Sequence, residues 1–180
     1  MLLLIQYTLI FASVLALVAL GGCFSEHSGV INIGLEGIMV MGALGGALAM
    51  KFVPAGVPAI VMFLLVVLAS LLMGVLFSLL LGVAAINFNA DQTLVGTALN
   101  LMGTAAAVVI VRAINVAENP DNVSSTIVYR KAKQVFLVNI GDFEFNWFML
   151  IVVLVLIAAH IVLYKTRFGL RLCACGEHPQ

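Results

Sequence analysis

The chain has 180 residues, of which 64% are hydrophobic and only 9% are charged, and its mean hydropathy is +1.24. Soluble domains carry about 25% charged residues, so this composition excludes a soluble globular domain and indicates an integral membrane protein. Eight basic side chains balance eight acidic ones, which excludes the strongly basic surface that nucleic-acid binding requires.

Apolar segments long enough to cross a hydrocarbon core of about 30 Å recur along the chain. They are continuous and do not alternate, so we predict an all-α polytopic membrane protein with five hydrophobic segments. The first segment, Leu2 to Leu20, is predicted to be a helix that faces membrane lipid. No lysine or arginine precedes it, which favours a retained span over a cleaved signal peptide.

The second segment, Gly29 to Met50, holds two side chains that a lipid-facing helix should avoid, Asn32 and Glu36. A carboxylate at the bilayer centre costs about 2.5 to 3.5 kcal/mol, so Glu36 must pair, lie near an interface or face a protein interior. If the segment is helical, Asn32 and Glu36 share one face, and its glycines admit a close neighbour. We predict a packed helix, broken or continuous, inside a transporter. The alternative places Glu36 at a helix end near water, where it only fixes topology.

The third segment, Val57 to Ile86, has no charged residue and is longer than a bilayer requires, so we predict a tilted, kinked or protruding helix. Small side chains recur on it every four residues, and this spacing favours close packing against another helix. These small residues are Ser70, Gly74, Ser78 and Gly82.

The fourth segment, Thr93 to about Val111, follows the polar link 87–92 and has one polar face. Its polar residues occur at i, i+4, i+7 and i+11, and they are Thr93, Thr97, Asn100 and Thr104. Such a stripe either hydrogen-bonds to neighbouring helices or lines a substrate pathway, and the pattern fits both.

Residues 113–146 form the one long polar segment, which we predict to be an extracytoplasmic loop. Two short runs in it, Ser125 to Arg130 and Gln134 to Val138, are predicted to pair as a small hairpin. Three basic residues of this loop, Arg130 among them, weigh against that side of the membrane.

The last span, Trp147 to Tyr164, has an aromatic residue at each end, as expected at the membrane interfaces. His160 near its end is interpreted as a packed or interfacial histidine rather than a proton relay. Lys165 and the arginines that follow it place this end in the cytoplasm by the positive-inside rule.

The reactive side chains do not form an enzyme site. Cys23, Cys173 and Cys175 make no disulfide framework, and the spacing of the last two, with His178 nearby, does not match a metal motif. We therefore predict no metal and no cofactor. The sequence holds neither a nucleophile and base at suitable spacing nor a phosphate-binding glycine loop, so any ATP hydrolysis belongs to a partner chain.

Two stretches resemble a known family when they are taken together. They are Ser25 to Gly37, and Thr166 to Leu172 with Gly176 to Pro179. Both are similar to inner-membrane permeases of bacterial ABC importers in the branched-chain amino acid, ribose and nucleoside group, and most similar to its nucleoside and simple-sugar branch. The link 89–92 with its following helix also fits. The signature residues of the first stretch are Gly29, Asn32, Gly34, Glu36 and Gly37.

The resemblance implies several partners. Two permease subunits would form the pathway, two cytoplasmic ATP-binding subunits would bind beneath them, and an extracytoplasmic lipoprotein would deliver substrate. Residues 165–180 would be the cytoplasmic loop whose short coupling helix docks on the ATPase, with contacts expected from Arg167, Phe168, Gly169, Arg171, Gly176, Glu177 and Pro179.

The chain departs from the family pattern at two places. Cys173 and Cys175 stand where the family usually has an arginine and an aliphatic residue. The sequence also stops at Gln180, inside the expected coupling loop, so we expect residues 1–180 to be a single permease domain truncated at its C-terminus.

The expected function is that of a permease subunit of an ATP-driven importer for nucleosides or simple sugars in the bacterial inner membrane. One alternative is an ion-coupled secondary transporter or channel-like protein, with Glu36 as its ion or proton site. Another is a membrane scaffold that transports nothing. Under the importer reading, Asn32 and Glu36 are architectural, and substrate contact is expected at Thr97 and Asn100.

Overall fold

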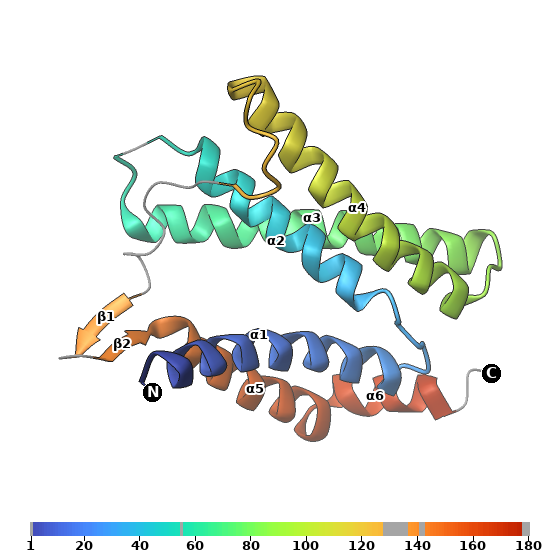
Figure 1. The fold of residues 1–180 in the computed structure, drawn as a ribbon. Coiled ribbons are helices and arrows are strands. Elements are labelled where there is room, and N and C mark those ends of the chain that lie inside the picture. The colour runs from blue at the N-terminus through green and yellow to red at the C-terminus, as the bar shows by residue number, and fades with distance from the viewer. Residues whose placement is uncertain (1, 55, 128–136, 141–142, 178–180) are drawn as a thin grey trace. The chain divides into compact units, whose positions relative to one another are not determined.

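A computed structural model describes residues 2–54, 56–127, 137–140 and 143–177. Its elements are α1 (Leu2–His27), α2 (Leu35–Phe52), α3 (Ala59–Asn87), α4 (Gln92–Glu118), β1 (Leu137–Ile140), β2 (Phe143–Asn146), α5 (Trp147–Lys165) and α6 (Arg167–Glu177) (Figure 1). They divide into two compact units. The first unit comprises Met1–Asn32 and Phe136–Gln180, and the second comprises Ile33–Val135.

The predicted all-α polytopic fold is confirmed. Within the described residues, the five helices α1 to α5 are each long and apolar enough to cross a membrane. Two helices run further than predicted. α1 continues beyond Leu20 to His27, and α4 continues beyond Arg112 to Glu118, so residues 113–118 belong to a helix and not to the polar segment. Arg112 does not stop α4 because its side chain is exposed and long enough to extend toward water.

The second segment becomes helical later than predicted. Gly29 has φ +79°, a left-handed conformation that glycine adopts without steric cost, and α2 begins only at Leu35. Asn32 therefore lies in the non-helical lead of α2, so the condition under which it would share a helical face with Glu36 is not met. From Leu35 to Phe52, α2 is one continuous helix.

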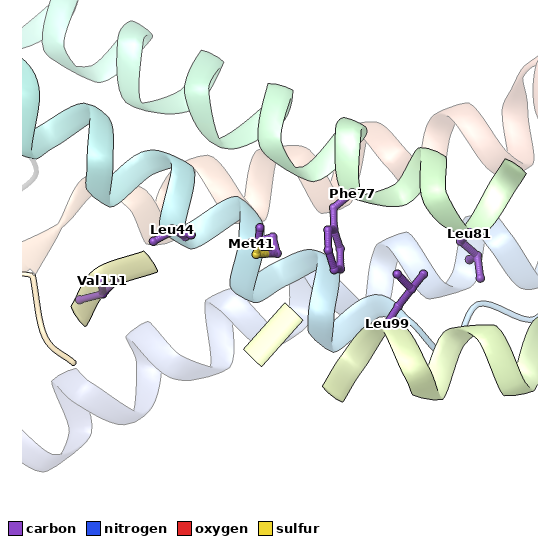
Figure 2. Close-up of a cluster of buried hydrophobic side chains, with 6 residues drawn as sticks. All are labelled: Met41, Leu44, Phe77, Leu81, Leu99 and Val111. Carbon is purple, nitrogen blue, oxygen red and sulfur yellow. The ribbon is translucent and has the colours of Figure 1, made fainter. Parts of the chain in front are cut away.

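The second unit is built around α2, which packs against both α3 and α4. Its buried cluster, drawn in Figure 2, joins side chains of all three helices, namely Met41, Leu44, Phe77, Leu81, Leu99 and Val111. These apolar side chains lose their contact with the surroundings by packing on one another, while most other large apolar residues of α3 stay exposed, as suits a helix surrounded by lipid.

The predicted small-residue stripe of α3 is a packing surface over part of its length. A Cβ added to Gly45 of α2 would lie 2.8 Å from the carbonyl oxygen of Ala69, and one added to Gly46 would collide with Ser70 Oγ. A Cβ added to Gly74 would lie 3.9 Å from Ile38 of α2, whereas one added to Gly82 would have no atom of the described residues within 4 Å. The stripe therefore contacts α2 near Ser70 and is open at its far end.

The first unit packs α1 against α5 and α6. On α5, Val152, Ala159 and Leu163 are buried. β2 contacts α1 and leads directly into α5, so both helices run in the same direction, from the hairpin toward α6 (Figure 1). The hairpin pairs Leu137 with Asn146 in antiparallel register.

The predicted hairpin differs from the observed one. Ser125 to Ile127, the described part of its first predicted strand, are not in a strand, and residues 128–136 lie outside the described residues. The observed strands come later, directly before α5. Alternating apolar residues occur on both sides of residue 134, so the pattern alone did not fix which runs pair.

Candidate functional site

The start of α2 is held by a side chain from α4. Gly34 occupies the N-cap position and makes no side-chain cap, although the first amide groups of a helix need partners outside it. Asn100 Oδ1 accepts a hydrogen bond from the Gly37 amide at 2.7 Å, and Asn100 Nδ2 donates to the Ile33 carbonyl at 2.8 Å. Gly37 is the third residue of α2, the position that an ordinary N-cap side chain serves. Asn100 therefore caps α2 from another helix.

Glycines bring α2 and α4 close enough for this bond. A Cβ on Gly37 would lie 2.5 Å from the Leu99 carbonyl oxygen, and one on Gly103 would lie 2.9 Å from Gly37 Cα. A Cβ on Gly96 would lie 2.9 Å from the Gly34 amide nitrogen. The two backbones touch along two turns of α4, so a larger residue at any of these positions would push the helices apart.

Two threonines of the polar stripe, Thr97 and Thr104, bond within their own helix. Thr97 Oγ1 donates to the carbonyls of Thr93 and Leu94 at 3.1 and 2.9 Å. Thr104 Oγ1 donates to the carbonyls of Asn100 and Leu101, both at 3.0 Å. Thr93 and Thr97 are exposed and Thr104 is half-buried. Within the described residues, the side chain of Asn100 therefore bonds the start of α2, whereas the hydroxyls of Thr97 and Thr104 bond carbonyls of α4.

Glu36 lies in the first turn of α2 and is exposed. A carboxylate is stabilised there because the amino end of a helix carries a partial positive charge. Asn32, in the lead before α2, is half-buried, and its Oδ1 has no hydrogen-bond partner within the described residues. The signature residues Gly34, Glu36 and Gly37 are therefore brought together at one helix end, whereas Asn32 precedes it.

Three polar groups fix the ends of helices in the second unit. Asp91 caps α4. Its carboxylate accepts hydrogen bonds from the Leu94 and Thr93 amides, and these bonds hold the pKa of the Asp91 carboxyl below its usual value. Lys51, at the end of α2, pairs with Glu118 at 3.0 Å. The buried Asn115 donates to the carbonyls of Ser124 and Thr126, which ties the following loop to α4. Sequence reasoning missed Asn115, although it continues the polar face of α4.

The predicted coupling loop is a helix, α6, with one packed and one exposed face. Its packed face, spaced at i, i+3, i+4 and i+7, consists of Gly169, Leu172, Cys173 and Gly176. The Gly169 backbone lies against Leu163, so a Cβ there would collide with the Leu163 carbonyl. The exposed face and helix ends carry most of the predicted coupling residues, namely Arg167, Phe168, Arg171 and Glu177, together with Cys175. Pro179 and His178 lie outside the described residues.

The far end of α6 rests on the turn that follows α1. A Cβ on Gly176 would lie 2.5 Å from the His27 carbonyl oxygen and 2.9 Å from the Gly29 amide nitrogen. Gly29 of the first signature stretch and Gly176 of the second therefore meet through backbone contact within the first unit. His160 is exposed, and its ring lies 5.0 Å from that of Tyr164.

Comparison with known proteins identifies the same family along almost the whole chain. The family model described as "Branched-chain amino acid transport system / permease component" matches residues 4–180. The guanosine ABC transporter permease protein NupQ of Bacillus subtilis is 39% identical over 96% of this chain and 55% of its own length. The nucleoside ABC transporter permease protein NupC of Lactococcus lactis is 37% identical over the same shares.

A putative glucose ABC transporter permease protein of Haloferax volcanii, TsgC13, is 57% identical over 35 residues, which are 19% of this chain and 11% of that protein. No solved structure matches. The chain spans about half the length of the curated relatives it matches across most of its residues. It belongs to the family of branched-chain amino acid transport system permease components, which confirms the resemblance carried by its two signature stretches.

Proposed function

We propose that this chain acts as a permease subunit of an ATP-driven importer for nucleosides in the bacterial inner membrane. The observation that carries the proposal is its match, over nearly all of its residues, to permeases named for guanosine and for nucleosides. Five helices of membrane-spanning length agree with that role. The match to the glucose permease is confined to a short stretch and gives sugars less support.

The proposed partners follow from the division of labour in such importers. Cytoplasmic ATP-binding subunits would supply energy, and an extracytoplasmic substrate-binding lipoprotein would deliver the nucleoside. A second permease subunit would complete the pathway, with membrane lipid around the apolar faces of the helices. The exposed face of α6, which holds Arg167, Phe168 and Arg171, is the proposed docking surface for the ATP-binding subunit.

The proposed pathway residues are the threonines of α4. Thr93 and Thr97 are exposed and their hydroxyls can still accept a hydrogen bond, because a hydroxyl oxygen has two lone pairs. Thr104 lies one to two turns further along the same face. Asn100 would shape the pathway indirectly, since both ends of its amide already bind the start of α2.

The proposed topology follows from the first unit. If α6 is cytoplasmic, the hairpin end of that unit and the start of α1 lie outside, because α1 and α5 run in the same direction. Residues 119–146 would then be extracytoplasmic. The exposed Lys165 and Arg167, at the α5–α6 junction, agree with a cytoplasmic side.

Uptake tests the proposed function directly. A host strain that lacks the natural protein containing these residues is expected to lose ATP-dependent uptake of radiolabelled guanosine, while uptake of ribose and leucine is unchanged. Uptake should be blocked by orthovanadate and should persist with a protonophore at constant cellular ATP. Uptake that stops with the protonophore and resists orthovanadate would instead establish the ion-coupled alternative.

Cross-linking tests the docking surface. We expect a photoactivatable thiol reagent attached at Cys175, which is exposed, to capture an ATP-binding subunit several-fold more often than the same reagent at Cys173. Cys173 is the matched control because it lies on the packed face of the same helix, two residues away. The first variant keeps Cys175 alone and carries Cys23→Ser and Cys173→Ser. The second keeps Cys173 alone and carries Cys23→Ser and Cys175→Ser. Labelling of Cys175 from outside intact cells would refute the cytoplasmic position of α6.

A further inference from the structure

The turn after α1 is closed by its own hydrogen bonds. We call residues 25–30 the Ser25 turn. Ser25 Oγ donates to the Val30 carbonyl at 2.7 Å, and the Val30 amide donates to the Ser25 carbonyl at 3.2 Å. Ser28 Oγ also donates to the Ser25 carbonyl, at 2.6 Å. Side-chain and backbone bonds thus join both ends of the turn, so it can move as a rigid piece.

The Ser25 turn and α6 are in backbone contact. A Cβ on Gly29 would lie 3.0 Å from Gly176 Cα, and a Cβ on Gly176 would lie 2.9 Å from the Gly29 amide nitrogen. Figure 1 shows the end of α6 beside the end of α1. Backbone atoms cannot rotate away as a side chain can, so a shift of α6 toward the turn must displace it.

A contact between two aromatic rings joins the end of α5 to the Ser25 turn. The Tyr164 ring, at the end of α5, lies 6.2 Å from the His27 ring at an interplanar angle of 89°. His27 Nδ1 is 2.8 Å from the Cys23 carbonyl, which holds the ring against α1. The ends of α1, α5 and α6 therefore form one junction around the Ser25 turn.

We propose that the Ser25 turn is the element through which movement of α6 reaches α2. The chain leaves the turn at Val30 and runs through four residues into α2, whose start is fixed to α4 by Asn100. Displacement of α6 by a partner would thus be delivered to the start of α2 along a short covalent path. This inference rests on the proposed function, since it takes an ATP-binding subunit as the partner that moves α6.

Gly176→Ala tests the contact in the complete transporter of the host membrane. The added methyl group would meet the backbone of the Ser25 turn and separate it from α6. We expect capture of the ATP-binding subunit through Cys175 at the unchanged level and continued ATP hydrolysis. Guanosine imported per ATP hydrolysed should fall on the order of tenfold, within the usual range of coupling between two sites. Gly82→Ala is the control, because no atom of the described residues lies within 4 Å of that added carbon.

A milder pair of variants covers the case in which Gly176→Ala does not accumulate. Ser25→Ala removes the side-chain bond that closes the turn, and it should lower the transport-to-hydrolysis ratio in the same direction. Ser13→Ala is its control, because Ser13 Oγ bonds only the Leu9 carbonyl within α1. A ratio that Ser25→Ala leaves at the wild-type value overturns the inference. Absence of Cys175 capture in the wild type would instead count against the proposed docking of α6.

Discussion

Asn100→Ala is expected to be the most damaging single substitution in the second unit. It would leave the Gly37 amide and the Ile33 carbonyl without their partner. The Gly37 bond is part-buried, and a buried polar group left unpaired costs about 1–3 kcal/mol, which is a large share of the roughly 5–15 kcal/mol that stabilises a typical domain. The bond to the Ile33 carbonyl is exposed, so its loss adds less. We expect most of the detergent-extracted protein to lose its monodisperse peak in size-exclusion chromatography.

Two further substitutions separate capping from a pathway role. Asn100→Asp keeps an acceptor for the Gly37 amide and removes the donor to Ile33, so its loss of folded protein should be intermediate. Thr97→Val should leave the peak intact, because the Thr97 hydroxyl bonds only its own helix. Reduced guanosine uptake by folded Thr97→Val protein would support the pathway assignment. An Asn100→Ala protein as stable as Thr97→Val would refute the capping role.

Gly103→Ala is expected to have the second largest effect. The added carbon would lie 2.9 Å from both Cα and the carbonyl oxygen of Gly37. Neither atom can move without shifting α2, and overpacking of this kind costs about 1–3 kcal/mol. We expect a lower midpoint of thermal unfolding for the purified protein, together with a partial loss of the Asn100 bonds that depend on this close approach.

Gly74→Ala is the control for that experiment. Its added carbon would have ordinary contact with Ile38 at 3.9 Å. Alanine is also the better helix former by about 1 kcal/mol, so the midpoint should be unchanged or raised. Equal midpoints for Gly103→Ala and Gly74→Ala would show that α2 and α4 are not held in backbone contact at Gly37.

The membrane spans could be predicted because continuous apolar composition depends on local sequence alone. The polar stripe of α4 was predicted as one face, since its spacing follows the helical repeat. The partner of Asn100 could not be predicted, because Gly37 lies 63 residues away and no local pattern records that distance. The spacing of Thr97 and Thr104 is the same whether their hydroxyls bond their own helix or line a pathway, so the sequence could not distinguish the two.

The ends of the elements were harder to predict for physical reasons. Gly29 permits a left-handed φ but does not require one, so the sequence does not fix where α2 begins. The resemblance implies a short helix within residues 165–180, but the sequence alone does not fix its bounds at Arg167 and Glu177. Its packed face has a signal nonetheless, since Gly169 and Gly176 are seven residues apart and thus on one side of a helix. Asn115 lies beyond the predicted end of the fourth segment at about Val111, so the predicted polar face does not include it.

The cap that Asn100 provides has a consequence for how the chain is made. Asn100 follows Gly37 by 63 residues, and a ribosome adds that length in about 3 to 13 s at about 5–20 residues per second. During that interval the newly made start of α2 lacks the side chain that binds its Gly37 amide and the Ile33 carbonyl in the folded unit. The start of α2 can therefore form its hydrogen bonds to Asn100 only after α4 has been synthesised. We expect α2, α3 and α4 to pack together in one step after that point.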